Sequence, residues 1–136
     1  MVKISIAYEG DLRCRLTHGP SGKEITTDAP VDNQGKGEAF SPTDLAAAAL
    51  GSCILTVMGI AARKNGINMD GATASVEKQM VVVPVRRIGT ITVMVNMPSG
   101  IAPAHRELLE KIAHTCPVHQ SLHPDVKMPI TIQYPD

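Results

Sequence analysis

Aromatic side chains are scarce in this sequence of 136 residues, which has no Trp, one Phe and two Tyr. A protein that binds single-stranded nucleic acid uses aromatic rings on which the bases stack, and few such rings are available here. An excess of charge of one sign is also missing, because 13 basic residues balance 13 acidic ones and the basic residues are scattered. We therefore expect neither nucleic acid nor an anionic membrane surface as a partner.

Cysteine occurs only three times, and the N-terminal stretch MVKISIAYEG lacks the apolar core of a signal peptide. This N-terminus predicts a cytoplasmic protein. Three thiols in a reducing compartment do not build a framework of structural disulfides, so reactive and metal-binding roles are open to them. Repeats and low-complexity tracts are absent, and the length predicts a single domain over residues 1–136.

One long helix is predicted over residues 41–66, SPTDLAAAALGSCILTVMGIAARKNG. Ser41 before Pro42 is typical of a helix N-cap, and Asp44 stands where it can complete a capping box. Gly66 is typical of the residue that ends a helix. Both ends of this segment therefore carry a signal for a helix boundary.

The middle of that segment, residues 45–62, has 18 residues without a charge, and eight of them are Ala or Gly. Such a length lies at the lower limit for a membrane span. A helix that is apolar on every side and lined with small residues is more simply interpreted as a helix buried on all faces than as a membrane span. We therefore predict a core helix rather than a membrane span.

Alternating and β-rich runs on both sides of this helix predict strands, and two further segments predict shorter helices. The predicted strands cover residues 2–8, 12–17, 23–27, 72–83, 88–97 and 128–134, and the predicted helices cover 103–114 and a short stretch that begins at Cys116-Pro117. Residues 28–40 are polar and contain glycine, which predicts a long loop of the kind that often carries function. The order of elements predicts an α+β fold with antiparallel sheet.

The strand predicted to begin at Leu12 separates two kinds of side chain. Leu12, Cys14 and Leu16 alternate with Arg13 and Arg15, so the two sets lie on opposite faces. Two arginines on one face of a strand are usually solvated. Cys14 is expected in apolar packing beside the two leucines.

The other two cysteines stand in different settings. Cys53 lies in the middle of the apolar helix, where a cysteine often serves as a small core residue. Cys116 directly precedes Pro117, which predicts a helix N-cap whose free N–H groups favour a thiolate. His119 follows Cys116 at C-x₂-H spacing, but a tetrahedral zinc site needs four ligands and the other thiols are far away in sequence. We expect no metal and no cofactor.

SPTDLAAAALGSC, followed later by TCPVHQSL, resembles the OsmC/Ohr family of peroxide-reducing proteins, and the match extends over nearly the whole chain. The resemblance implies an OsmC-like fold, in which antiparallel sheets pack around a long buried helix that carries a cysteine. It also implies an intertwined homodimer with active sites at the subunit interface. In such a protein Cys53 is the peroxidatic cysteine, Cys116 is the resolving cysteine, organic or hydrogen peroxides are the substrates, and an external dithiol is the reductant.

Peroxide reduction needs Cys53 as a thiolate, which attacks the O–O bond and becomes a sulfenic acid. An apolar environment disfavours the thiolate, so a nearby cation is required. The resemblance implies an arginine near the first strand turn for this role. Arg13 is the closest match in position, and Arg15 on the same face is the alternative.

One position departs from the family pattern. Thr43 stands where the family's peroxidases usually have a glutamate that orients the arginine, ten residues before the helix cysteine. Asp44 is adjacent but about 100° further round the helix, and it can serve in the capping box instead. A second function therefore stays open, namely a non-catalytic thiol module that senses redox state or binds a small apolar molecule.

Overall fold

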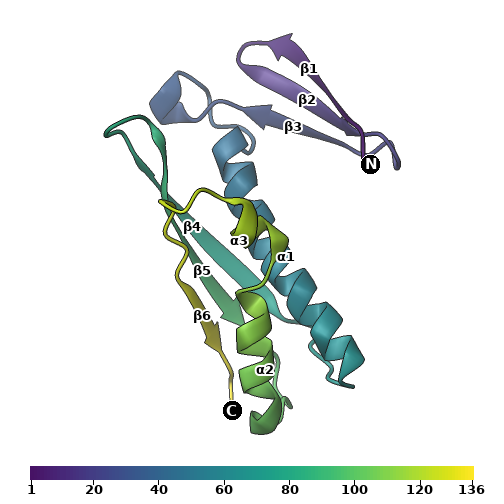
Figure 1. Ribbon diagram of the computed structural model, residues 1–136. Helices are drawn as coiled ribbons and strands as arrows, with labels where there is room; N and C mark the ends of the chain where they lie inside the picture. The colour runs from purple at the N-terminus through teal and green to yellow at the C-terminus, as the bar shows by residue number, and fades with distance from the viewer. The chain divides into compact units, whose positions relative to one another are not determined.

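The computed structural model describes residues 1–136 and divides into two compact parts, residues 1–46 and 47–136 (Figure 1). The first part contains strands β1 (Ile4–Gly10), β2 (Arg13–His18) and β3 (Glu24–Asp28), a short 3₁₀ helix η1 (Val31–Asn33) and the start of helix α1 (Pro42–Lys64). The second part contains the rest of α1, strands β4 (Thr73–Val81) and β5 (Arg87–Asn96), helices α2 (Pro103–Ala113) and α3 (Pro117–Ser121), and strand β6 (Ile130–Gln133). The α+β class is confirmed.

In the first part, β1, β2 and β3 form an antiparallel sheet in that order (Figure 1). Leu16 on β2 lies opposite Ile6 on β1 and Ile25 on β3, and directly opposite residues share a face. Ile6 is 61% exposed and Ile25 is 49% exposed. We call this surface, made by Ile4, Ile6, Tyr8, Leu16 and Ile25, the apolar face of the first sheet. A single chain leaves it largely uncovered.

Leu12 lies in the turn between β1 and β2, so its prediction as a strand residue is wrong. Asp11 and Leu12 both have positive φ, 53° and 62°. Two successive residues at positive φ make the tight hairpin turn whose twist matches that of the flanking strands. Cys14 and Leu16 keep the predicted face, with Cys14 opposite Tyr8.

The predicted long loop between β3 and α1 is closed at its ends, where the Asp28 N–H donates to the Phe40 carbonyl at 3.0 Å. Inside the loop, the Gly37 N–H donates to the carbonyl of Ala29 at 3.2 Å. Gly35 approaches the same carbonyl so closely that a Cβ atom there would lie 1.8 Å from its oxygen. The loop is therefore folded tightly against the end of β3.

Helix α1 begins and ends as its sequence predicts. The Asp44 N–H donates to Ser41 Oγ and the Ser41 N–H donates to Asp44 Oδ2, both at 3.0 Å, which is a complete capping box. At the other end Gly66 has φ 65°, and the Ile67 N–H donates to the Ala62 carbonyl at 2.9 Å. This geometry is a Schellman motif, so both boundaries of α1 are set by local hydrogen bonds.

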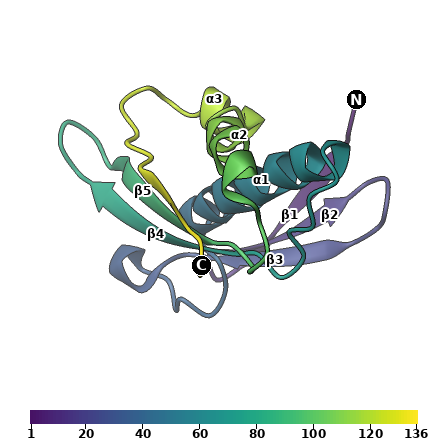
Figure 2. The same ribbon diagram turned by 90° about the horizontal axis from the view of Figure 1, so that it is seen from below.

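In the second part, β5 is the middle strand of a sheet with β4 and β6 at its edges, and α1 and α2 lie against one face of it (Figures 1 and 2). Alternate residues of β5 point into a core shared with both helices. The fully buried members of this core are Leu50, Ile54 and Met58 of α1, Ile91, Val93 and Val95 of β5, and Leu109 of α2. This packing gives the second part its own hydrophobic core.

Strand β6 runs parallel to β5, so the prediction of antiparallel pairing throughout is wrong. The connection from β5 to β6 passes through α2 and α3. Parallel strands require such a long crossover, whereas β4 and β5 are joined by a hairpin and are antiparallel.

Helix α1 is buried along one side only within a single chain. Ala47, Leu50 and Met58 are at most 2% exposed, whereas Ile60 is 52% exposed. The predicted burial on all faces is therefore not reached by one chain. Length and composition alone would allow α1 to cross a membrane, but the core helix of a globular protein meets the same criterion.

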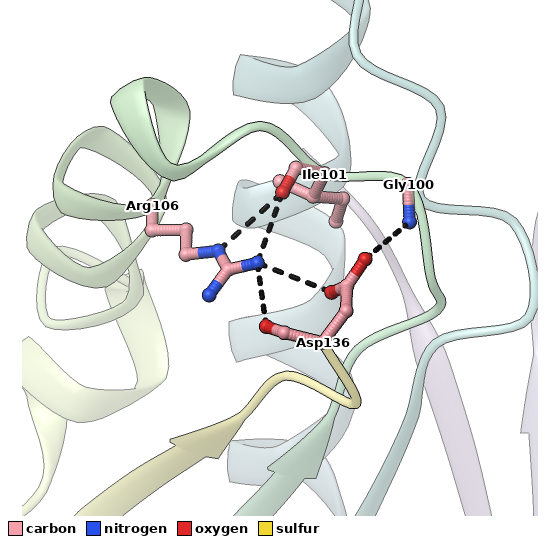
Figure 3. A network of polar contacts seen from close by, with 4 residues as sticks. All are labelled: Gly100, Ile101, Arg106 and Asp136. Atoms are coloured by element: carbon pink, nitrogen blue, oxygen red, sulfur yellow. Dashed lines mark hydrogen bonds and ion pairs between the residues drawn. The ribbon is translucent and has the colours of Figure 1, made fainter.

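The last residues of the chain are tied to the start of α2 through Arg106 (Figure 3). The Arg106 guanidinium donates to the Ile101 carbonyl at 3.2 Å and to the carbonyl and Oδ1 of Asp136 at 3.0 and 3.1 Å. The Gly100 N–H donates to the other carboxylate oxygen of Asp136 at 3.3 Å. Arg106 also lies 4.4 Å from the centre of the Tyr134 ring. The segment after β6 is thereby held against α2.

Candidate thiol site

Two of the three cysteines meet in the second part of the chain. Cys53 projects from the middle of α1, and Cys116 stands at the start of α3, where it is fully buried. Cys53 lies close enough to Cys116 to raise the pKa of its thiol, and neither cysteine is in a disulfide. Cys53 is only partly buried, so it is the more accessible thiol of the pair. The fold thus brings together two thiols that are far apart in the sequence.

The start of α3 is built around the Cys116 sulfur. Cys116 is the N-cap, and its Sγ accepts the His119 N–H at 3.2 Å. This confirms the N-cap predicted from Cys116-Pro117. The sequence also predicted that the helix start would favour a thiolate here, and that prediction is wrong. Burial raises the pKa of the Cys116 thiol and outweighs the N–H groups of His119 and Val118, which lower it.

The contact with Cys53 raises the pKa of Cys116 further. Cys116 is therefore a thiol that holds its proton more tightly than an ordinary cysteine.

An apolar groove of about 320 Å³ runs between α1 and α2. Val57 and Leu108 are among its lining residues, and so is Thr115. Val57 lies one helical turn after Cys53, and Thr115 directly precedes Cys116, so the groove extends toward the thiol pair. Neither Cys53 nor Cys116 itself lines the groove.

The two candidate arginines lie in the first part of the chain, on one face of β2. Arg13 Nη2 lies 3.1 Å from Glu38 Oε2 and 3.6 Å from Asp28 Oδ2. Arg15 Nε lies 3.8 Å from Glu9 Oε2 and has the more exposed side chain. The hydrogen bond and the charge of Glu38 raise the pKa of Arg13. Arg13 is thus the more firmly held of the two.

Asp28 and Glu38 were missed by the sequence analysis. Asp28 had a usable signal, because an acidic residue at the end of β3 falls opposite Arg13 when three antiparallel strands are aligned. No sequence signal pointed to Glu38, since its position depends on the fold of the loop between β3 and α1. No group of three or more His, Cys, Asp or Glu side chains is arranged to hold a metal ion.

Residues 35–131 match the family model for OsmC-like proteins. The chain belongs to the OsmC-like family. This confirms the resemblance drawn from the two cysteine motifs, and it agrees with the α+β architecture described above. No curated protein matches this sequence.

Solved structures of other OsmC-like proteins have the same fold. A protein of Psychrobacter arcticus 273-4, named provisionally as an osmotic stress induced and detoxification response protein, is 44% identical, with a TM-score of 0.92 over 98% of this chain and 96% of that one. An organic hydroperoxide resistance protein OsmC of Legionella pneumophila is 15% identical, with a TM-score of 0.78 over 98% and 96%. The organic hydroperoxide resistance protein OhrB of Bacillus subtilis is 17% identical, with a TM-score of 0.72 over 98% of both chains. The last two similarities show the fold alone.

Proposed function

We propose that this OsmC-like protein is a thiol-dependent peroxidase that reduces organic hydroperoxides or hydrogen peroxide. The observation that carries the proposal is that the fold brings Cys53 of α1 and Cys116 at the start of α3 close enough to influence each other. The names of two solved relatives, which describe organic hydroperoxide resistance proteins, support the substrate class.

The reaction is written for a hydroperoxide ROOH. The Cys53 thiolate attacks one peroxide oxygen, the O–O bond breaks, ROH leaves after taking up a proton, and Cys53 becomes a sulfenic acid. The Cys116 thiol then attacks the Cys53 sulfur, water leaves, and a disulfide joins the two residues. An external dithiol restores both thiols by exchange and is itself oxidised to a disulfide.

The two cysteines differ in ways that support this order. Cys53 is partly exposed, so a peroxide can reach it. Cys116 is fully buried and holds its proton more tightly than an ordinary thiol, which suits a residue that waits for the sulfenic acid.

Arg13 is proposed as the cation that supports the Cys53 thiolate and donates to the departing oxygen, with Arg15 as the alternative. Its two carboxylate contacts favour Arg13, because a guanidinium with two carboxylate partners is better oriented than one with a single distant partner. Asp44 Oδ2 accepts the Ser41 N–H in the capping box of α1.

The working unit is proposed to be an intertwined cytoplasmic homodimer of single domains, residues 1–136. The apolar face of the first sheet and the exposed side of α1 support this assembly, since both are apolar surfaces that a second copy would cover. The proposal includes a peroxide and an external dithiol as reaction partners, and no nucleic acid, membrane or cofactor.

Steady-state consumption of an alkyl hydroperoxide in the presence of a dithiol tests the proposal. The parent protein is expected to turn over, and Cys53→Ser is expected to lose all activity because the attacking sulfur is gone. Cys14→Ser is the matched control and should remain active, since Cys14 lies on the first sheet among Tyr8 and Thr27. A parent protein that does not turn over would favour the second candidate, a non-catalytic thiol module that holds a small apolar molecule in the groove between α1 and α2.

A further inference from the structure

We propose that the short helix α3 is a redox-dependent latch, which is ordered while Cys116 is a free thiol and released when Cys116 becomes part of a disulfide. The inference rests on the proposed function, in which a disulfide joins Cys53 and Cys116, and it adds a conformational consequence of that step. The cause of the release is that one sulfur atom serves both as the resolving thiol and as the N-cap of the helix.

The Cys116 sulfur is the acceptor that completes the first turn of α3. Its Sγ accepts the His119 N–H at 3.2 Å, and the Val118 N–H lies near enough to lower the pKa of the thiol. Pro117 has no N–H, and the Gln120 N–H already donates to the Cys116 carbonyl at 3.1 Å. The first N–H groups of a helix need an acceptor outside the helix, and here that acceptor is a single sulfur atom.

Few other interactions hold α3 in place. The helix has only five residues and none of them is buried, and Val118 and Leu122 pack only partly against the core. The Gln120 side chain donates to the His114 carbonyl, but this hydrogen bond is exposed. A helix of this length is not stable by itself, because helix formation begins with a costly nucleus. The fully buried Cys116 is therefore the main anchor of α3.

Disulfide formation takes this anchor away from the helix. Two S–H bonds are lost and one S–S bond forms, while the oxidant takes up two electrons and two protons. The Cys116 sulfur is then bonded to a sulfur on α1, so its position is set by Cys53 and no longer by the start of α3. Cysteine sulfur is only a weak acceptor, so the displaced atom no longer satisfies the His119 N–H. The first turn of α3 loses its cap and the helix is released.

Release of α3 gives the external dithiol access to the disulfide. Cys116 is fully buried in the reduced protein, so a reductant does not reach its sulfur while α3 is ordered. Thiol–disulfide exchange depends on access to a sulfur atom as well as on the attacking thiolate. The latch therefore shields the resolving thiol before oxidation and exposes it afterwards. Reduction returns the sulfur to the N-cap, and α3 is ordered again.

Hydrogen exchange followed by mass spectrometry tests the latch in the full-length protein. The peptide that covers residues 114–123 is compared between protein reduced with dithiothreitol and protein oxidised with diamide, which makes disulfides without any peroxide, and the disulfide is reduced after the exchange is quenched. The amides of α3 are expected to exchange at least about fivefold faster in the oxidised protein, the order expected for loss of an N-cap. Strand β5 is the internal reference and should exchange equally in both forms.

Two substitutions at one position separate the cap from the disulfide. Cys116→Ser keeps an acceptor at the N-cap and cannot form the disulfide, so α3 should stay protected with and without diamide. Cys116→Ala lacks the acceptor, so α3 should exchange fast under both conditions. Cys53→Ser is the matched control, because it retains the Cys116 cap but has no partner for it on α1, and diamide should leave α3 protected.

Equal exchange of α3 in the reduced and the diamide-oxidised parent would overturn the proposal, and so would a Cys116→Ala protein that is protected like the parent. Failure of diamide to join Cys53 and Cys116 would overturn it as well, since the release would have no trigger. The proposed function is judged separately, with one equivalent of alkyl hydroperoxide in place of diamide. A disulfide and a released α3 with diamide, but neither with the peroxide, would support the latch and refute the peroxidase.

Discussion

At the scale of single residues, the environment of Cys116 shows burial and local hydrogen bonding acting in opposite directions. The His119 N–H bonds to the sulfur and favours a thiolate, yet the sulfur is fully buried and its pKa is raised. Desolvation penalises the charged form of a whole side chain, and two backbone N–H groups at the start of a short helix offset only part of that penalty. Cys116 therefore serves best as a protonated thiol.

The raised pKa of Cys116 predicts a pH dependence of stability. The folded protein binds the Cys116 proton more tightly than the unfolded chain, so the stabilisation is complete below the pKa of the unfolded thiol. It is lost as the pH rises through the pKa of the folded state. Urea unfolding of the reduced protein from neutral to alkaline pH should show a steeper loss of stability in the parent than in Cys116→Ala. Equal slopes would show that Cys116 does not hold its proton as described.

At the scale of elements, helix α1 owes its boundaries to its own sequence. Ser41 and Asp44 close the first turn, and Gly66 stops the last one. These interactions span only a few residues, so they need no tertiary partner to be effective. They fix where the helix starts and hence where Cys53 stands along it.

Loss of the cap should cost measurable stability. Ser41 is 1% exposed, so Ser41→Ala removes a buried acceptor from the Asp44 N–H. We expect a loss of about 1 kcal/mol in the free energy of unfolding, the typical value for an N-cap serine. Urea unfolding measures it. Ser99→Ala, at an exposed loop position, is the control and should stay within about 0.5 kcal/mol of the parent. A Ser41→Ala protein as stable as the parent would mean that the cap contributes nothing.

The sequence could predict features that depend on residues close together in the chain, and it could not predict features that depend on distant residues. The ends of α1 and the N-cap at Cys116 were predictable because their signals are local. The direction of β6 was not, because it depends on how α2 and α3 carry the chain across the sheet. The pKa of Cys116 depends on burial by distant residues, and the contact of Glu38 with Arg13 depends on a loop fold that no periodicity encodes.

At the scale of the whole molecule, two apolar surfaces remain uncovered in a single chain. On the first sheet Ile4, Ile6 and Tyr8 are each more than half exposed, and on α1 the side that carries Ile60 is open. Soluble monomers rarely leave contiguous apolar surface of this kind in contact with water. The sequence predicted a helix buried on all sides, and a second copy of the chain would complete the burial that one copy leaves unfinished.

A dimer should therefore be the state in solution. Sedimentation at micromolar concentration is expected to give twice the chain mass of 14.5 kDa. Ile6→Lys should weaken the association because it places a charge on the apolar face of the first sheet. Ser5→Lys is the matched control, since Ser5 points to the opposite face of β1, and it should remain dimeric. A parent protein that sediments as a clean monomer would contradict the proposed assembly.

The central claim is that Cys53 reacts with peroxide and Cys116 resolves the product. The most direct measurement is dimedone trapping after one equivalent of alkyl hydroperoxide, with the adduct located by peptide mass spectrometry. In Cys116→Ser the adduct should appear on Cys53, because the sulfenic acid then has no thiol beside it, and excess peroxide should oxidise it further. In Cys53→Ser no adduct is expected on Cys116. An adduct on Cys116 in Cys53→Ser, or no adduct in either variant, would contradict the account.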